Sequence, residues 1–469
     1  MSVLIKNGLV ITHAGSFEAD VLIEGDKVTA LGARGTDWPA DDVIDASGKY
    51  VVPGGIDVHT HMELPFGGTF ASDSFETGTR AAAWGGTTTI IDFAVQSKGR
   101  GLMEGWEAWM AKAEGNCAID YGFHCILSDV NDQSLKEMDI AIGEGVSSFK
   151  MFMAYPGVFY STDGEIFRAM QKAAENGATI MMHAENGIAI DVLIAQALER
   201  GETDPLYHGI VRKSILEGEA THRAIKLAEL AGSPLYIVHL SALEALAEVT
   251  NARDEGLNVY AETCPQYLFL DLDDLGNGFE GAKFVCSPPL RDRAEGHQEA
   301  LWSGLATNDL QVVSTDHCPF CFEDHPELGR QKRLGEGDFS KIPNGLPGVE
   351  HRVELIYHGA VTEERLSLER WVEVCSTTPA RMFGLFPRKG TIAVGADADI
   401  VILDPKRKHV LSATTHHMRT DYSCYEGMQL AGGVDTVLSR GRVIISGNEY
   451  RGQKGDGKYL KRELNQYLV

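Results

Sequence analysis

The order of its apolar segments predicts an α/β fold for this chain: a (β/α)8 TIM-like barrel with a small β-sandwich domain built from both termini. Eight short apolar runs, most of them rich in β-branched residues, alternate with longer segments of helical periodicity. Near both ends of the chain, strands of alternating polar and apolar residues occur instead. A chain of 469 residues is also long enough for one large barrel with a smaller attached domain.

The eight apolar runs are expected to be the parallel strands of the barrel. Near-continuous apolarity is typical of parallel strands that helices cover on both faces. Between the runs, segments such as "EIFRAMQKAAENG" and "EALAEVTNARDEG" are amphipathic and end at a glycine, as helices commonly do. Eight such strand-helix units predict a (β/α)8 barrel. The runs span residues 54–61, 87–93, 121–127, 147–153, 179–185, 234–240, 259–265 and 312–317.

The two ends of the chain are expected to form the small β domain together. The strands "VLIKNGLVIT" and "ADVLIEGDKVTALG" lie near the N-terminus, and the same alternation returns in "GADADIVILD" and "VDTVLSRGRVIISG". We therefore predict that residues 1–52 and 386–450 form the β-sandwich domain and that residues 53–385 form the barrel. Residues 451–469 are a locally basic tail, for which we weigh a solvated arm against a subunit contact.

Composition and charge exclude several classes of protein. The formal net charge of −25 argues against a nucleic-acid binder, whose affinity comes mostly from lysine and arginine. No apolar run approaches the roughly 20 residues of a membrane helix, and the first residues resemble a strand rather than a signal peptide. The eight cysteines show no disulfide-like spacing. We expect a cytoplasmic protein that binds neither nucleic acid nor membrane.

Reactive side chains gather at the strand ends where barrel enzymes place their chemistry. A single histidine in a strand is usually a core or rim residue, so the argument depends on several of them sharing one end of the barrel. His59 and His61 add weight because residues two apart on a strand project to the same face and can share an ion. The candidates are His59, His61, Lys150, His183, His239 and Asp316.

These candidates predict two metal ions bridged by a modified lysine. Four histidines and one aspartate exceed the three protein ligands of a single catalytic zinc. Two adjacent cations need a bridging anion, and we find no unused carboxylate at these strand ends. Lys150 lies in the apolar run "SSFKMFMAYPG", where burial lowers the lysine pKa and favours the neutral amine. That amine can capture carbon dioxide as a carbamate, which offers one oxygen to each metal.

The segments "GGIDVHTH", "SSFKMFMAYPG", "MMHAENG", "YIVHLS", "ETCPQYL", "SPPLR", "VVSTDH" and "IPNGLPGVE" together resemble the dihydropyrimidinases and D-hydantoinases of the amidohydrolase superfamily. The resemblance covers nearly the whole chain. It implies a binuclear zinc centre in which His59, His61 and Asp316 hold the more buried metal. It also implies that His183 and His239 hold the more exposed one, with Lys150, as N6-carboxylysine, bridging both.

The same resemblance implies the reaction and the substrate contacts. A metal-bridging hydroxide would open the ring amide of dihydropyrimidines (5,6-dihydrouracil, dihydrothymine) or hydantoins to N-carbamoyl amino acids, as in pyrimidine catabolism. Asp316 would transfer the proton, Tyr155 would donate a hydrogen bond to the carbonyl oxygen, and backbone groups of Ser287 and Asn344 would hold the opposite ring edge. The family is commonly homotetrameric. The residues that would shape the pocket for the ring substituent are Leu64, Phe66, Phe152 and Phe159.

Three alternatives remain open. Dihydroorotases place an arginine two residues after the second histidine, where this chain has Glu63, which disfavours an anionic ring substrate. Allantoinase is excluded less cleanly because its substrate is also a hydantoin. The third alternative is a non-catalytic scaffold, as in the collapsin response mediator proteins, but those relatives have lost metal ligands that this chain retains.

Overall fold

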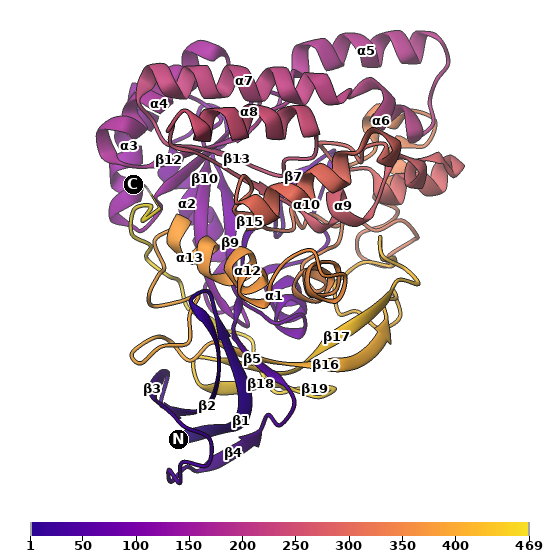
Figure 1. The fold of residues 1–469 in the computed structure, drawn as a ribbon. Helices are drawn as coiled ribbons and strands as arrows, with labels where there is room; N and C mark the ends of the chain where they lie inside the picture. Colours follow the sequence, from indigo (N-terminus) through magenta and orange to yellow (C-terminus); the bar gives the residue numbers. More distant parts are fainter. Residues whose placement is uncertain (1, 468–469) are drawn as a thin grey trace.

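The structure, a computed structural model, describes residues 2–467, and eight parallel strands form its barrel (Figure 1). Consecutive strands are hydrogen-bonded neighbours, and a bridge between Thr60 and His317 brings the last strand back to the first, so that the barrel is nearly closed. The strands are β6 (Gly55–Thr60), β9 (Thr87–Val95), β10 (Asp120–Ile126), β11 (Ser148–Phe152), β12 (Thr179–His183), β13 (Leu235–Ile237), β14 (Val259–Thr263) and β15 (Val312–Val313). The predicted fold class is confirmed.

Helices surround the barrel strands. The predicted helix at "EIFRAMQKAAENG" begins after Thr162, whose side chain accepts a hydrogen bond from the Glu165 N–H, and ends at Gly177 in the left-handed conformation, with φ of 78°. The longer helices are α1 (Phe75–Trp84), α2 (Leu102–Ala113), α3 (Asp132–Gly143), α4 (Asp163–Asn176), α5 (Gly187–Glu199), α7 (Ser214–Ala231), α8 (Leu243–Asp254) and α10 (His297–Thr307). The shorter ones are α6 (Leu206–Val211), α9 (Pro265–Phe269), α11 (Arg352–Tyr357), α12 (Leu368–Val372) and α13 (Thr378–Met382).

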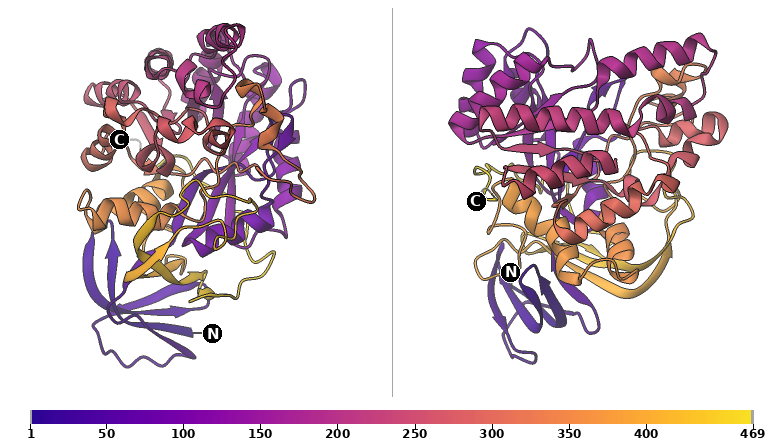
Figure 2. Two further views of the ribbon diagram at one scale, coloured as in Figure 1. Left: turned by 90° about the vertical axis from the view of Figure 1, so that its right-hand side faces the viewer. Right: turned by 45° about the horizontal axis from the view of Figure 1, so that its top comes forward.

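Both ends of the chain form one mostly antiparallel sheet beside the barrel (Figure 2). β5 pairs with β16, which joins the N-terminal strands to the C-terminal ones in a continuous nine-stranded sheet. The strands are β1 (Ser2–Thr12), β2 (Gly15–Glu24), β3 (Lys27–Gly32), β4 (Asp42–Asp45), β5 (Tyr50–Pro53), β16 (Ile400–Val410), β17 (Gln429–Ser439), β18 (Arg442–Ser446) and β19 (Glu449–Tyr450). A small hairpin, β7 (Pro65–Phe66) and β8 (Thr69–Phe70), follows β6.

A buried lysine joins this β domain to the barrel. The Nζ of Lys389 lies 2.6 Å from a carboxylate oxygen of Asp120 at the start of β10. It also lies 3.1 Å from Asp397 and 2.5 Å from Asp399, which precede β16. Burial opposes the charge, but the three carboxylates outweigh it and hold the pKa of Lys389 above its ordinary value. Asp120, Asp397 and Asp399 form a group that could hold a metal ion, but the lysine ammonium lies among them.

The tail after residue 450 packs on its own barrel. The Leu460 N–H donates to the Tyr121 carbonyl at 2.7 Å, and the Tyr121 N–H donates to the Lys458 carbonyl at 3.0 Å. The guanidinium of Arg462 is buried and donates to the Phe123 carbonyl and, at 3.1 Å, to the Ser148 hydroxyl. A solvated arm is therefore wrong for residues 458–466, while residues 468 and 469, like residue 1, lie outside the described part. A subunit contact stays a prediction.

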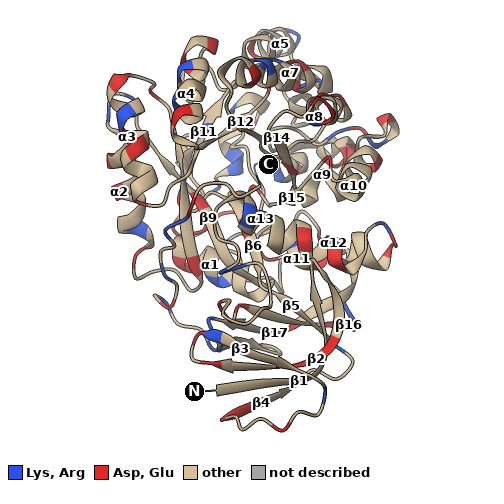
Figure 3. Cartoon of the chain, turned by 60° about the vertical axis from the view of Figure 1, so that its left-hand side comes forward, with Lys and Arg blue, Asp and Glu red and all other residues tan. Residues whose placement is uncertain are grey.

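Most lysine, arginine, aspartate and glutamate residues of the barrel lie on the helices and loops around its strands (Figure 3). The barrel strands themselves are largely buried, as near-continuous apolar runs require. Among residues 2–467, no helix combines the length and the apolar character that crossing a bilayer requires.

Candidate active site

A cavity at the C-terminal ends of the barrel strands contains the predicted site. Twelve of the thirteen predicted site residues line it. The remaining one, His59, is fully buried beneath it and contacts Lys150 and Asp316. The lining consists of His61, Leu64, Phe66, Ile126, Lys150, Phe152, Tyr155, Phe159, His183, His239, Ser287, Asp316, Cys318 and Asn344.

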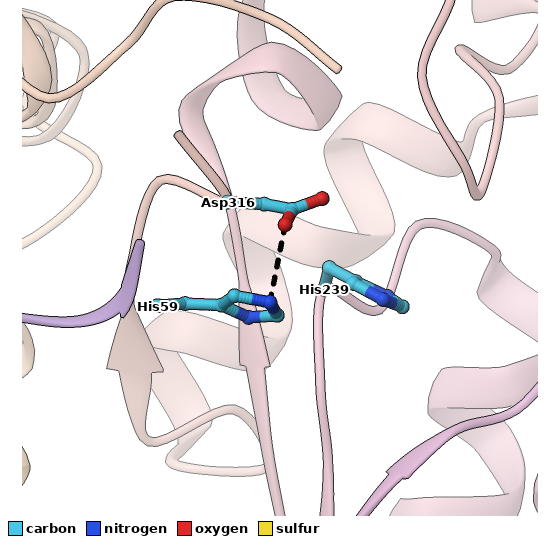
Figure 4. Close-up of side chains that lie close together, drawn as sticks. All are labelled: His59, His239 and Asp316. Atoms are coloured by element: carbon cyan, nitrogen blue, oxygen red, sulfur yellow. Dashed lines mark ion pairs between the residues drawn. The ribbon is translucent and has the colours of Figure 1, made fainter. Parts of the chain in front are cut away.

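Three of the predicted metal ligands, His59, His239 and Asp316, lie close together, and His59 is paired with Asp316 (Figure 4). The Nε2 atoms of His59 and His61 lie 3.1 and 3.2 Å from the same Asp316 oxygen, and the Lys150 Nζ lies 2.8 Å from His59 Nε2. One ligand atom each from His59, His239 and Asp316 lie within 4.8 Å of one another. The rings of His183 and His239 are 4.5 Å apart between centroids. Imidazoles with a carboxylate are the donor set that divalent zinc prefers, so these residues fit such an ion.

Burial shifts the pKa of each of these groups, although at His59 the carboxylates of Asp316 and Glu262 outweigh it and raise the pKa. Burial lowers the pKa of His61 to about 3 and that of Lys150 to about 8, although Asp316 opposes both shifts. Burial also opposes ionisation of Asp316, but the adjacent His59 and hydrogen bonds from both histidines hold the pKa of Asp316 well below its ordinary value. Near neutral pH the site therefore contains a neutral His61, an ionised Asp316 and a readily deprotonated Lys150.

An aromatic wall adjoins this polar cluster, since the rings of Phe152 and Tyr155 lie 5.4 and 5.3 Å from that of His183 between centroids. Phe159 stacks on Phe152 at 5.0 Å and on Phe66 at 6.3 Å between ring centroids, and Phe66 meets Tyr155 edge to face at 5.3 Å. Burial raises the pKa of Tyr155 to about 12, so its hydroxyl stays protonated and can donate a hydrogen bond. Next to this hydroxyl, the Asn344 amide donates to the Ser287 hydroxyl at 3.0 Å.

The comparison with known proteins identifies the family. The model of the amidohydrolase family matches residues 50–444. This chain belongs to the amidohydrolase family. It is 66% identical to the D-hydantoinase of Streptomyces coelicolor over 99% of both chains, and 50% identical to that of Geobacillus stearothermophilus over 98% of this chain and 97% of the relative. The crystal structure of dihydropyrimidinase from Brevibacillus agri matches with a TM-score of 0.96 at 48% identity, over 99% of both chains. The predicted resemblance, and with it the prediction of a hydrolase, is confirmed.

Two carboxylates in this amidohydrolase were missed in the sequence. Glu262 in β14 accepts hydrogen bonds from His59 Nδ1 and, at 2.9 Å, from the Tyr236 hydroxyl. Glu185, two residues after His183, lies 2.7 Å from His183 Nε2. The search for an unused carboxylate at these strand ends overlooked both of these acids. Both acids are already paired with a histidine nitrogen, which leaves the other ring nitrogen free to bind a metal. Their position in "VYAET" and "MMHAE", close to predicted strand ends, was the available signal.

The backbone is strained at three of the predicted site residues of this amidohydrolase. Tyr155, His239 and Asp316 have φ values of 62°, 40° and 52°, in the left-handed region that residues other than glycine rarely adopt. Such strain persists only where the surrounding structure holds it, and it is found most often at functional sites. Here it turns the chain at the ends of the strands and directs these side chains into the cavity.

Glu262→Gln is expected to weaken metal binding by about 10- to 100-fold, because the charge that orients His59 is lost while the side chain keeps its size. Competition with a chelator measures the metal dissociation constant. Glu354→Gln is the matched control, since Glu354 accepts from His409 Nε2 at 3.0 Å and neither residue lines the cavity. Equal metal affinity in the wild type and Glu262→Gln would contradict this role.

Proposed function

We propose that this amidohydrolase is a binuclear zinc enzyme that opens the ring amide of hydantoins and dihydropyrimidines to N-carbamoyl amino acids. The observation that carries the proposal is the cavity at the strand ends, in which metal-donor atoms adjoin an aromatic wall. The identity of 66% to a D-hydantoinase supports the reaction class. A homotetramer, as the family resemblance implies, is part of the proposal.

His59, His61 and Asp316 would hold one metal, and His183 and His239 the other. Lys150 would bridge them after its neutral amine attacks the carbon of carbon dioxide, forms an N–C bond and loses one proton. The low pKa of the buried amine favours this modification. Two metals held by these residues would supply a hydroxide near neutral pH and would polarise the substrate carbonyl.

The protein's own groups orient the ring and move the proton. The protonated Tyr155 hydroxyl would donate to the carbonyl oxygen as negative charge develops on it, a contact that commonly contributes about 3 to 4 kcal/mol to catalysis. The backbone at Ser287 and Asn344 would hold the opposite edge of the ring. Asp316, ionised before the reaction, would accept the proton of the attacking hydroxide and return it to the ring nitrogen as the C–N bond breaks.

The lining of the cavity favours a neutral ring with an apolar substituent. Among the described residues that line it there is no arginine, which a substrate carboxylate would need. Glu63, at the position where dihydroorotases carry an arginine, lies outside the lining and accepts a hydrogen bond from the Phe75 N–H at 3.3 Å. Dihydroorotate is therefore disfavoured, and 5-substituted hydantoins suit the aromatic wall.

Metal analysis combined with initial rates tests the proposal. The substrates are dihydrouracil, hydantoin, 5-phenylhydantoin, dihydroorotate and allantoin, with the ring-opened ureide measured as product. We expect about two zinc ions per chain and the highest rates on 5-phenylhydantoin and dihydrouracil. Preference for allantoin or dihydroorotate would assign the chain to those alternative activities. A protein without metal that turns over none of these rings would reject the enzyme and support the scaffold.

A further inference from the structure

Lys332 is a buried lysine that lies outside the metal cluster. Its side chain has an exposed fraction of 0%, and its Nζ donates to the backbone carbonyls of Val285 at 3.1 Å, Pro343 at 2.8 Å and Gly345 at 2.9 Å. Within residues 2–467, no carboxylate forms an ion pair with it. Lysine is almost never fully buried without such a partner, so this arrangement calls for an explanation.

The three carbonyls belong to the two segments that carry Ser287 and Asn344. Val285 lies two residues before Ser287, and Pro343 and Gly345 flank Asn344. The segments are also joined directly, because the Gly345 N–H donates to the Val285 carbonyl at 3.0 Å and the Asn344 amide donates to the Ser287 hydroxyl. Lys332 itself does not line the cavity. The Lys332 ammonium, outside the cavity lining, thus connects the two backbone segments that carry the predicted substrate contacts Ser287 and Asn344.

The segment around Asn344 also packs closely against a second stretch of backbone. A Cβ on Gly345 would lie 2.2 Å from the carbonyl oxygen of Cys318, so the backbone there packs directly against the chain that follows Asp316. The segment is therefore held between the Lys332 ammonium and the chain that leaves β15. A change at Lys332 would be expected to move the ring-binding backbone and not the metal ligands, none of which Lys332 contacts.

We propose that Lys332 is a positioning residue that fixes the spacing of the 285–287 and 343–345 segments and so sets the affinity for the ring edge of the cyclic ureide. This inference rests on the proposed function. Hydrogen bonds from an ammonium are shorter and stronger than those between neutral groups, so one lysine can hold three carbonyls in place. An apolar side chain would leave the three carbonyls unpaired, and the segments would separate or admit water.

Lys332→Met and Lys332→Arg test the inference in the zinc-loaded protein. For Lys332→Met we expect KM for 5-phenylhydantoin to rise by at least about tenfold, the effect of one lost charged hydrogen bond, with kcat within about threefold of the wild type. The inhibition constant of the N-carbamoyl product should rise in parallel, and the zinc content should stay unchanged. Lys332→Arg keeps a cationic donor, so its KM should fall between those of the wild type and Lys332→Met.

Arg462→Met is the matched control because Arg462 is another buried cation that donates to carbonyl and hydroxyl oxygens away from the cavity. It should lower the melting temperature and leave KM unchanged.

Wild-type KM in every Lys332 variant that folds, or a loss of zinc equal to the loss of activity, would overturn the inference. If Lys332→Met does not fold, the KM of Lys332→Arg decides, because the larger guanidinium must also shift the segments. A wild type that opens no cyclic ureide would instead reject the proposed function itself.

Discussion

Lys150→Ala is expected to lose both metals and to lower kcat/KM for 5-phenylhydantoin by at least about 10³-fold, since it removes the group that would bridge the two cations. Without that anion, the adjacent cations repel each other and neither ligand set is complete. The Lys150 Nζ lies 2.8 Å from His59 Nε2, so the alanine also opens a gap beside that histidine. Elemental analysis of the purified variant and initial rates with and without added zinc measure both effects.

Short carboxylic acids provide the second part of this test. A carboxylate that diffuses into the gap can offer one oxygen to each metal, so partial recovery of activity is expected with acetate or propionate. Met151→Ala is the matched control because Met151 is the next residue in β11 and projects to the opposite face of the strand. Full activity with two metals in Lys150→Ala would rule out a bridging lysine.

Lys389→Met is expected to lower the free energy of unfolding by about 3 to 5 kcal/mol, as is typical when one partner of a buried ionic group is removed. The variant leaves Asp120, Asp397 and Asp399 close together and buried. Burial already raises the pKa of Asp399, so the folded variant should bind additional protons. Because a raised carboxyl pKa in the folded state stabilises at low pH, the loss should be smaller under acidic conditions than at neutral pH.

Denaturant unfolding at two pH values measures this effect. Lys172→Met is the control, because Lys172 pairs with Asp139 at 2.8 Å on the surface, where such pairs contribute about 0 to 1 kcal/mol. Equal stability of Lys389→Met and Lys172→Met would show that the lysine is not needed to join the β domain to the barrel.

The barrel could be predicted because its strands are apolar on both faces, and this pattern is local in the sequence. The ends of the strands could not be predicted as well. The run 312–317 was expected to be a strand, but β15 covers only Val312–Val313. The chain turns at Asp316, whose φ of 52° lies in the left-handed region. That turn depends on the surrounding structure, and no glycine marks it in the sequence.

Site residues could be predicted where reactive side chains follow apolar runs. Contacts between side chains that are far apart in the sequence could not be predicted. Lys389 and Asp120 are 269 positions apart, and the sequence shows each charge without its partner. Glu262 and His59 are separated by 203 positions. Lys332 gave no signal because its partners are backbone carbonyls, which every residue carries. The packing of Arg462 against the barrel could not be predicted either, because its partners are backbone carbonyls and serine hydroxyls.

The predicted metal ligands and much of the aromatic wall of the cavity belong to different kinds of structure. This difference affects how such a protein can evolve. The predicted metal ligands lie in the barrel strands or within a few residues of their ends. Much of the aromatic wall comes from connecting segments: Phe66 from the β7–β8 hairpin and Phe159 from the segment after β11. Mutations in such segments are tolerated more readily than mutations in strands. Selection can therefore alter the accepted ring substituent step by step while the hydrolytic centre is inherited intact.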